Sequence, residues 1–293
     1  MRHGPGLNGP GAALARRRPG NCATGNLCAP ASDPKSKPWG SRGAQQSGVN
    51  KPVFPLRDSV GRNREPVVVW TIIGVNVVVF LYQLGLSTHE LHLFLYRHAL
   101  VPLRYFNPGW ARELGLSPTD LTPFLTNTFL HGGWLHIILN LWTLYIFGPA
   151  LEDRLGPMRF AILYVLAGIA ASATHAVFNA FSPTPVLGAS GAIAGIIAAY
   201  ATRFPHAWVQ VLLPILFIPL FFWIPAMAFA GIWFLAQVIQ GASELFAPFS
   251  ISGIAWWAHI GGFMTGWLLV YWLDRPHGSP AVRRAWYNGG PWE

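Results

Sequence analysis

Apolar residues occur in long segments separated by short polar ones, from Pro66 to the last apolar segment near Leu273. A helix needs about 20 predominantly apolar residues to cross a bilayer. Segments close to this length lie at 67–86, 132–149, 159–180, 187–203, 224–243 and 253–273. The pattern therefore predicts an all-α polytopic membrane protein with six spanning helices and a long, interrupted loop, residues 87–131, between the first two.

The apolar stretch 207–243 is long enough for two spans rather than one. Pro214, Pro219 and Pro225 disfavour a continuous helix in its first part, because proline lacks the N–H that a helix needs. We therefore interpret 207–222 as an interfacial or re-entrant approach to a single span. A seventh span is the alternative, and it would reverse the direction of the last helix.

The distribution of basic residues predicts which side of the membrane each loop faces. Of the 20 Lys and Arg, only three, Arg97, Arg104 and Arg112, lie in segments that the six-span topology places outside. The other 17 lie in the tails and inner loops, as the positive-inside rule requires. We expect a multi-pass protein of a bacterial cytoplasmic membrane with both termini in the cytoplasm.

The chain is expected to divide into a disordered basic tail (1–65), a six-span domain (66–275) and a cytoplasmic C-terminal tail (276–293). Residues 1–32 contain Arg and no acid, as transit peptides do, but their Gly and Pro disfavour an amphipathic helix. A cytoplasmic tail is therefore favoured. The net charge of +9 comes from the tails, where basic residues are not interleaved with aromatic ones. It indicates contact with the bilayer surface rather than with nucleic acid.

Neither cysteine nor histidine spacing indicates a metal or another cofactor, and we expect none. Cys22 and Cys28 lack the partners of a zinc site and form no disulfide framework. The chain has 10 His, which raises the alternative of a haem protein. However, His131 and His136 are five residues apart, a poor spacing for one helix face, and His259 has no partner at a matching spacing. The oligomeric state is not determined by the sequence.

Ser190 lies between two glycines in the segment 188–191, directly before an uncharged apolar stretch. A serine in the first turn of such a helix lies among free backbone N–H groups at the positive end of the helix dipole. Both features favour the formation of an anion there. The alternative is that a small serine only permits close packing of two membrane helices.

Other polar residues are predicted at a similar depth. His136 and Asn140 are four residues apart, so they share one face of the second span. His259 lies about two turns into the sixth span, which enters the membrane from the same side. Polar groups inside a membrane are costly and are usually functional. The alternatives are a hydrogen-bonded packing histidine at 259 and hydrogen bonds between helices at 136 and 140.

Glycines predict that the fourth and sixth spans pack closely. Gly262 and Gly266 follow His259 at small-xxx-small spacing, and Gly188, Gly191 and Gly195 offer a matching smooth surface. Close packing is what a serine and a histidine require to approach to about 3 Å.

Together these motifs resemble the rhomboid intramembrane serine proteases over about 54–273. The resemblance is found in His136-x3-Asn140, Gly188-Ala189-Ser190-Gly191 and Ala258-His259-x2-Gly262-x3-Gly266. Supporting matches are Phe129-Leu130-His131-Gly132, Gly148-x3-Glu152-x3-Gly156 and Trp256-Trp257-Ala258-His259. The resemblance implies a six-helix rhomboid-like bundle with serine endopeptidase activity. The implied substrates are transmembrane proteins that contain helix-weakening residues. The alternative is a non-catalytic rhomboid-like binder of membrane proteins.

The resemblance also implies roles for individual residues. Ser190 corresponds to the nucleophile and His259 to the general base of a dyad, since the fourth and sixth spans contain no acid for a triad. His136 and Asn140, with the backbone N–H of Ser190, correspond to an oxyanion hole. Glu152 and Arg154 correspond to structural positions.

Two positions depart from some family members. Thr122-Pro123 replaces a Trp-Arg pair in the loop before the second span, and Ala194 replaces a tyrosine that stacks on the catalytic imidazole. The orientation of His259 is therefore open.

Overall fold

A computed structural model describes residues 58–60, 64–215, 218–246 and 254–274. The predicted C-terminal tail and nearly all of the predicted N-terminal tail lie outside these residues. The helices are α1 (Val67–Gly85), α2 (Thr88–His98), α3 (Leu103–Phe106), α4 (Pro108–Glu113), α5 (Pro123–Thr126), α6 (Trp134–Leu155), α7 (Pro157–Phe178), α8 (Ser190–Arg203), α9 (Ala226–Phe246) and α10 (Trp256–Leu273). A 3-10 helix, η1 (Asn127–Phe129), and two strands, β1 (Trp208–Ile215) and β2 (Ile218–Pro225), complete the fold.

The predicted membrane-spanning helical fold is confirmed. The helices α1, α6 and α7, and α9 over 226–243, are long and apolar enough to cross a membrane. Helix α8 has only 14 residues, which at 1.5 Å per residue gives about 21 Å. Helix α10 has 18 residues and contains the polar His259, and it is not one of the four helices of the described residues that are long and apolar enough to cross a membrane. The count of six spans therefore stays a prediction.

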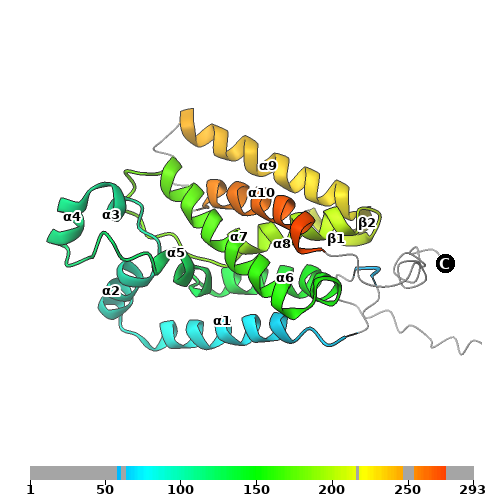
Figure 1. The fold of residues 1–293 in the computed structure, drawn as a ribbon, viewed down its shortest axis with the longest axis horizontal. Helices are drawn as coiled ribbons and strands as arrows, with labels where there is room; N and C mark the ends of the chain where they lie inside the picture. The colour runs from blue at the N-terminus through cyan, green and yellow to red at the C-terminus, as the bar shows by residue number, and fades with distance from the viewer. Residues whose placement is uncertain (1–57, 61–63, 216–217, 247–253, 275–293) are drawn as a thin grey trace, which may run out of the picture. The chain divides into compact units, whose positions relative to one another are not determined.

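Helix α8 lies in the middle of the bundle, in contact with α6, α7 and α10, whereas α1 and α9 lie on opposite sides (Figure 1). Every residue of α8 from Gly191 to Ala201 is buried. This burial is possible because the segment contains no charge before Arg203 and many small residues. The central helix therefore begins at Ser190.

Helix α6 is longer than predicted, because it continues through Pro149 and ends at Leu155 instead of at 149. The additional turns place Glu152 in the interior, where its carboxylate accepts the N–H groups of Val68 and Val69 at 2.9 and 2.8 Å. These donors belong to the first turn of α1 and have no partner within that helix. Gly156, with φ of 82°, then ends α6 in a conformation that favours glycine.

The segment 207–222, interpreted as an interfacial or re-entrant approach to a single span, contains no helix in its described residues and forms most of an antiparallel hairpin of β1 and β2. Its position relative to the membrane stays a prediction. Pairing runs from Trp208–Pro225 at the open end to Ile215–Ile218 at the turn. In a ribbon of two strands both strands are edges, where prolines are tolerated although they donate no hydrogen bond. The single helix that follows, α9, agrees with the expectation of one span. Asp58, within the predicted N-terminal tail, forms a bridge to Val209.

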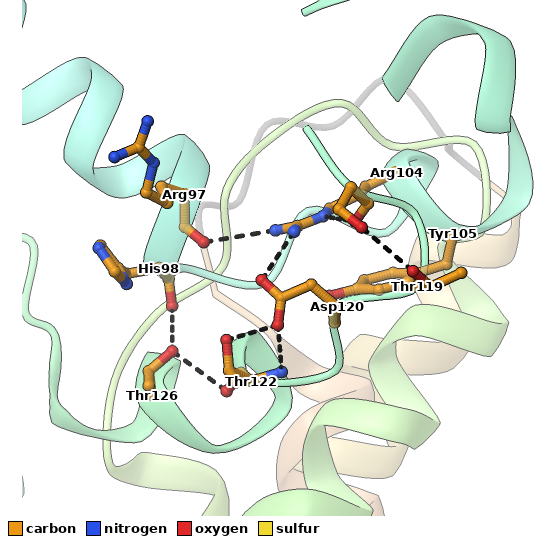
Figure 2. A network of polar contacts seen from close by, with 9 residues as sticks. Arg97, His98, Arg104, Tyr105, Thr119, Asp120, Thr122 and Thr126 are labelled. Carbon is orange, nitrogen blue, oxygen red and sulfur yellow. Dashed lines mark hydrogen bonds and ion pairs between the residues drawn. The ribbon is translucent and has the colours of Figure 1, made fainter. Parts of the chain in front are cut away.

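The loop between α1 and α6 contains the four short α-helices α2 to α5, the 3-10 helix η1 and a network of polar contacts (Figure 2). Arg104 is only 2% exposed, and it donates to the carbonyl oxygens of Ser117 and Arg97 and to the Asp120 carboxylate at 2.9 Å. Asp120 also accepts the hydroxyl of Thr122 at 2.7 Å and its backbone N–H at 3.0 Å. Hydrogen bonds from Thr122 and the Arg104 guanidinium keep the pKa of Asp120 below its usual range.

Glycines allow α8 and α10 to touch backbone to backbone, which confirms the predicted close packing. A methyl group at Gly262 would overlap the carbonyl oxygen of Gly191, and one at Gly266 would overlap the backbone of Gly195. Gly188 does not take part in this contact, contrary to expectation. It faces a side chain of α6 instead.

Candidate active site

The structure brings Ser190 and His259 together at the end of the bundle where α8 begins. The Nε2 atom of His259 lies 2.8 Å from the Oγ atom of Ser190. Ser190 is the first residue of α8, so its own N–H has no carbonyl acceptor within the helix. A hydroxyl, an imidazole and a free backbone donor thus meet at one point. This geometry suits activation of the serine oxygen as a nucleophile, and the catalytic roles stay a prediction.

The other nitrogen of His259 has a partner that the sequence analysis missed. Its Nδ1 atom lies 2.8 Å from Oε1 of Gln237, a buried residue of α9. The rings of Trp233 and Trp256 lie 5.6 and 6.2 Å from the imidazole, centroid to centroid. These three residues surround the imidazole, where Ala194 supplies no ring. Gln237 could have been noticed from the sequence, because it is a polar residue within the fifth predicted span.

His136 and Asn140 both face the turn that precedes Ser190. A Cβ atom at Gly188 would lie 2.7 Å from the His136 ring and 3.6 Å from Nδ2 of Asn140. Gly188 has φ of 127°, a conformation that side chains rarely adopt. The glycine is therefore required for two reasons. Its backbone conformation makes the turn, and its missing side chain admits the α6 residues.

One hydrogen bond indicates which nitrogen of the neutral His136 ring carries the proton. The backbone N–H of Gly132 donates to Nδ1 of His136 at 3.4 Å, so the proton of the neutral ring lies on Nε2. Nε2 is one of the ring atoms nearest to Gly188. His136 thus presents a donor toward the turn before Ser190, and its role in an oxyanion hole stays a prediction.

Asn140 is oriented by His131, a second contact that the sequence analysis did not foresee. The Nδ2 group of Asn140 donates to Nε2 of the buried His131 at 3.0 Å. The side-chain amide of Gln83 in turn pairs with the backbone N–H and carbonyl of His131 at 3.0 and 3.1 Å. The rings of His131 and His136 lie 5.1 Å apart, although the two residues are five positions apart. One hydrogen of the Asn140 amide remains for another acceptor.

The loop before α6 contacts the segment before α8. Leu100 and Val186 exchange two backbone hydrogen bonds at 2.9 and 2.7 Å, and Gly188 donates its N–H to the carbonyl of Asn127 at 2.9 Å. The side chain of Asn127 also donates to Ser172 of α7 at 2.9 Å. The turn that leads into Ser190 is therefore positioned by the loop. A mainly apolar cavity, lined in part by Ser190, also has Asn127, Ser172 and His175 in its wall.

Comparison with known proteins gives one family and several relatives. The Rhomboid domain model matches residues 118–276, which is more than half of the chain. "Rhomboid protein 1, mitochondrial" of Saccharomyces cerevisiae is 28% identical over 225 residues, covering 74% of this chain and 56% of that protein. "Presenilin-associated rhomboid-like protein, mitochondrial" of Rattus norvegicus is 27% identical over 203 residues, covering 68% and 47%. "RHOMBOID-like protein 4" of Arabidopsis thaliana is 30% identical over 154 residues, covering 52% and 34%.

The chain spans about half the length of the first two of these curated relatives. These relatives also contradict the expectation of a bacterial cytoplasmic membrane, because the yeast and rat proteins are named as mitochondrial. The expectation rested on the distribution of Lys and Arg. That distribution reports which loops share a side of a membrane, and it carries no information on which membrane it is.

Proposed function

The chain belongs to the rhomboid family, and from this premise we propose that it is an intramembrane serine endopeptidase. It hydrolyses peptide bonds in or near transmembrane segments of membrane proteins, by means of the domain 66–275. The observation that supports this most directly is the 2.8 Å contact between Nε2 of His259 and Oγ of Ser190. That contact occurs where the free N–H groups of α8 begin.

In the first step, Ser190 Oγ attacks the carbonyl carbon of the scissile peptide bond, and His259 accepts its proton as general base. The carbon–nitrogen bond then breaks, and His259 returns the proton to the departing amine. An ester of Ser190 with the substrate's N-terminal part remains. Water then attacks this ester, its proton again passes to His259, and the freed serine recovers a proton.

Both tetrahedral intermediates carry a negative oxygen that needs hydrogen-bond donors. The N–H of Ser190, the Nε2–H of His136 and the remaining hydrogen of Asn140 supply them. One such donor contributes about 3–4 kcal/mol to lowering the barrier. A site inside a membrane bundle excludes bulk water, which strengthens each of these interactions.

The position of the serine also constrains the substrate. The carbonyls of an intact transmembrane helix are hydrogen-bonded within that helix, which shields them from attack. A peptide bond becomes accessible only where the substrate helix opens locally. We therefore propose membrane protein substrates with helix-weakening residues, such as Gly or Pro, at the depth of Ser190.

The test uses the full chain in lipid vesicles with a model transmembrane substrate and a serine-directed fluorophosphonate probe. We expect wild type to cleave the substrate and to be labelled at Ser190. Ser190→Ala and His259→Ala should each abolish cleavage while the melting temperature stays close to that of wild type.

Near wild-type turnover by a folded Ser190→Ala protein would show that another group performs the chemistry. Absence of both labelling and cleavage in wild type, with substrate still captured, would instead identify a non-catalytic binder of membrane proteins.

A further inference from the structure

Gln237 is an unusual residue for its position in α9. The buried residues of this helix, within the part whose burial is described (226–243), form one stripe toward the bundle: Ala226, Ala230, Gln237 and Gly241. Gln237 is the polar member of this stripe and is 5% exposed. An amide inside a membrane bundle is costly unless both of its ends find partners. Both ends do so here.

The two partners determine which end of the amide faces the imidazole. The Nε2 group donates to the carbonyl of Trp233, one turn earlier, at 3.2 Å. Oε1 consequently lies on the other side, 2.8 Å from Nδ1 of His259. The reverse orientation would place Oε1 against the Trp233 carbonyl, two acceptors without a hydrogen between them. The amide therefore presents an acceptor to His259.

An acceptor at Nδ1 selects one tautomer of His259. The neutral ring carries its proton on Nδ1, and the lone pair of Nε2 is then directed at the hydroxyl of Ser190. That is the only neutral tautomer in which the imidazole can accept the serine proton. In the opposite tautomer the Nδ1 lone pair would face Oε1 of Gln237 with no hydrogen between them, and Nε2–H could only donate to Oγ of Ser190.

We propose that Gln237 is a positioning residue that selects the reactive tautomer of His259 and fixes its ring. This inference rests on the proposed function and adds α9 to the helices that build the site. The amide performs the orienting part of the role that a carboxylate has in a serine triad. It does so without a net charge, which would be costly to bury at this depth.

The main experiment compares Gln237→Leu, Gln237→Glu and a matched control, Gln240→Leu, which changes an exposed glutamine of the same helix. Leucine keeps the approximate volume but has no acceptor, whereas glutamate keeps an accepting oxygen toward Nδ1 and loses only the donor to the Trp233 carbonyl. For Gln237→Leu we expect kcat and the rate of fluorophosphonate labelling to fall about 10- to 100-fold, with KM within about twofold, because a buried donor loses its partner. Gln237→Glu should recover most of this loss, and Gln240→Leu should match wild type.

The pH profile separates positioning from packing. A glutamate beside Nδ1 favours the charged imidazole, so the acid limb of kcat/KM should move to higher pH in Gln237→Glu and stay in place in Gln240→Leu. A folded Gln237→Leu protein with kcat and labelling rate within twofold of wild type would overturn the proposal. Equal losses in the Leu and Glu variants, with an unchanged acid limb in Gln237→Glu, would also overturn it, because only packing would then matter.

Imidazole nitrogen NMR of the protein labelled with ¹⁵N-histidine tests the proposal without any activity. The His259 signals are assigned by their loss in His259→Asn. We expect the Nδ1–H tautomer in wild type and its loss in Gln237→Leu. An Nε2–H tautomer in wild type would overturn the proposal. Absence of cleavage and labelling in wild type, with the Nδ1–H tautomer present, would count against the proposed function alone.

Discussion

The contact between α8 and α10 and the loop between α1 and α6 both position Ser190, yet their physical basis is opposite. In the helix contact, glycines place backbone against backbone, and no side chain lies between Gly191 and Gly262. In the loop, a buried Arg104 donates to two carbonyls and to the Asp120 carboxylate. The helix contact depends on the absence of side-chain atoms, whereas the loop depends on an ion pair and hydrogen bonds.

This difference has consequences for how each region responds to change. Close packing tolerates no additional atom, because protein interiors are dense and adjust only in part. A polar network depends on the charge of its members, so pH and conservative substitutions affect it by degrees. Substitutions in the helix contact should therefore abolish activity, whereas those in the loop should reduce stability and activity partially.

The largest effect is expected for Gly262→Ala. The added methyl would overlap the Gly191 carbonyl, so α8 and α10 must separate and Ser190 moves away from His259. A displacement of about 1 Å in a catalytic site can cost on the order of 10²-fold in rate, and overpacking costs about 1–3 kcal/mol or more in stability. We expect no measurable turnover and a lower melting temperature.

Gly231→Ala in α9 is the control for this substitution, since nothing lies within 4 Å of the Cβ position there. It should retain wild-type turnover and thermal stability. Equal activity of Gly262→Ala and Gly231→Ala would show that the contact between α8 and α10 does not hold Ser190 beside His259.

A smaller effect is expected for Asn140→Ala and His136→Ala, whose side chains come from α6. Donors to an oxyanion act in the transition state, so kcat should fall about 10²–10³-fold for each while KM changes little. The double variant should lose less than the product of the two, because both donors serve one oxygen. Steady-state kinetics, with melting temperatures measured in parallel, provide the test.

A raised KM with unchanged kcat in a stable protein would move His136 and Asn140 from the oxyanion hole to substrate binding. His131→Leu gives an additional comparison. It removes the acceptor of the Asn140 amide, and we expect a smaller loss of kcat than for Asn140→Ala.

Arg104→Met should affect stability more than chemistry. It removes the three hydrogen bonds of a side chain that is 2% exposed, and leaves Asp120, which is 33% exposed, without its ion-pair partner. We expect a loss of about 1–3 kcal/mol in unfolding free energy, because Asp120 can still be hydrated. Turnover should fall only severalfold, through a looser turn at Val186–Gly188. Arg112→Met, in an exposed position of the same loop, is the control.

The smallest effect is expected from acidification of the loop. The pKa of Asp120 is lowered in the folded chain. The ionised carboxylate therefore contributes fully to the stability of the fold above pH 3.8, the ordinary pKa of this group, and the contribution is lost as the pH falls through the lowered pKa. Amide hydrogen exchange, corrected for its intrinsic pH dependence, should therefore accelerate in the loop below about pH 4. The α8–α10 amides should show no such step.

Asp120→Asn removes this titration, so its loop exchange should be fast at all pH values and should show no step near pH 4. A step that persists in Asp120→Asn would assign the titration to another acid. Burial raises the pKa of the neighbouring Tyr105 to about 12, so this phenol stays protonated through the whole experiment.

Much of the fold was predictable because it depends on local patterns. Apolar segments of nearly 20 residues locate the long helices, and glycines four residues apart locate the contact of α8 with α10. Ser190 and His259 could be singled out because polar residues inside a membrane are rare and costly. Each of these signals lies within one segment and requires no knowledge of its neighbours.

The tertiary structure alone decided the contacts between distant segments. Prolines in 207–222 disfavour a continuous helix, but only the pairing of β1 with β2 shows that a hairpin takes its place. Gln237 could have been noticed as polar, whereas its acceptor reaches His259 only because α9 packs beside α10. The pair Arg104–Asp120 was equally invisible to any local pattern. Which polar groups meet depends on how helices pack, and helix packing is a property of the whole chain.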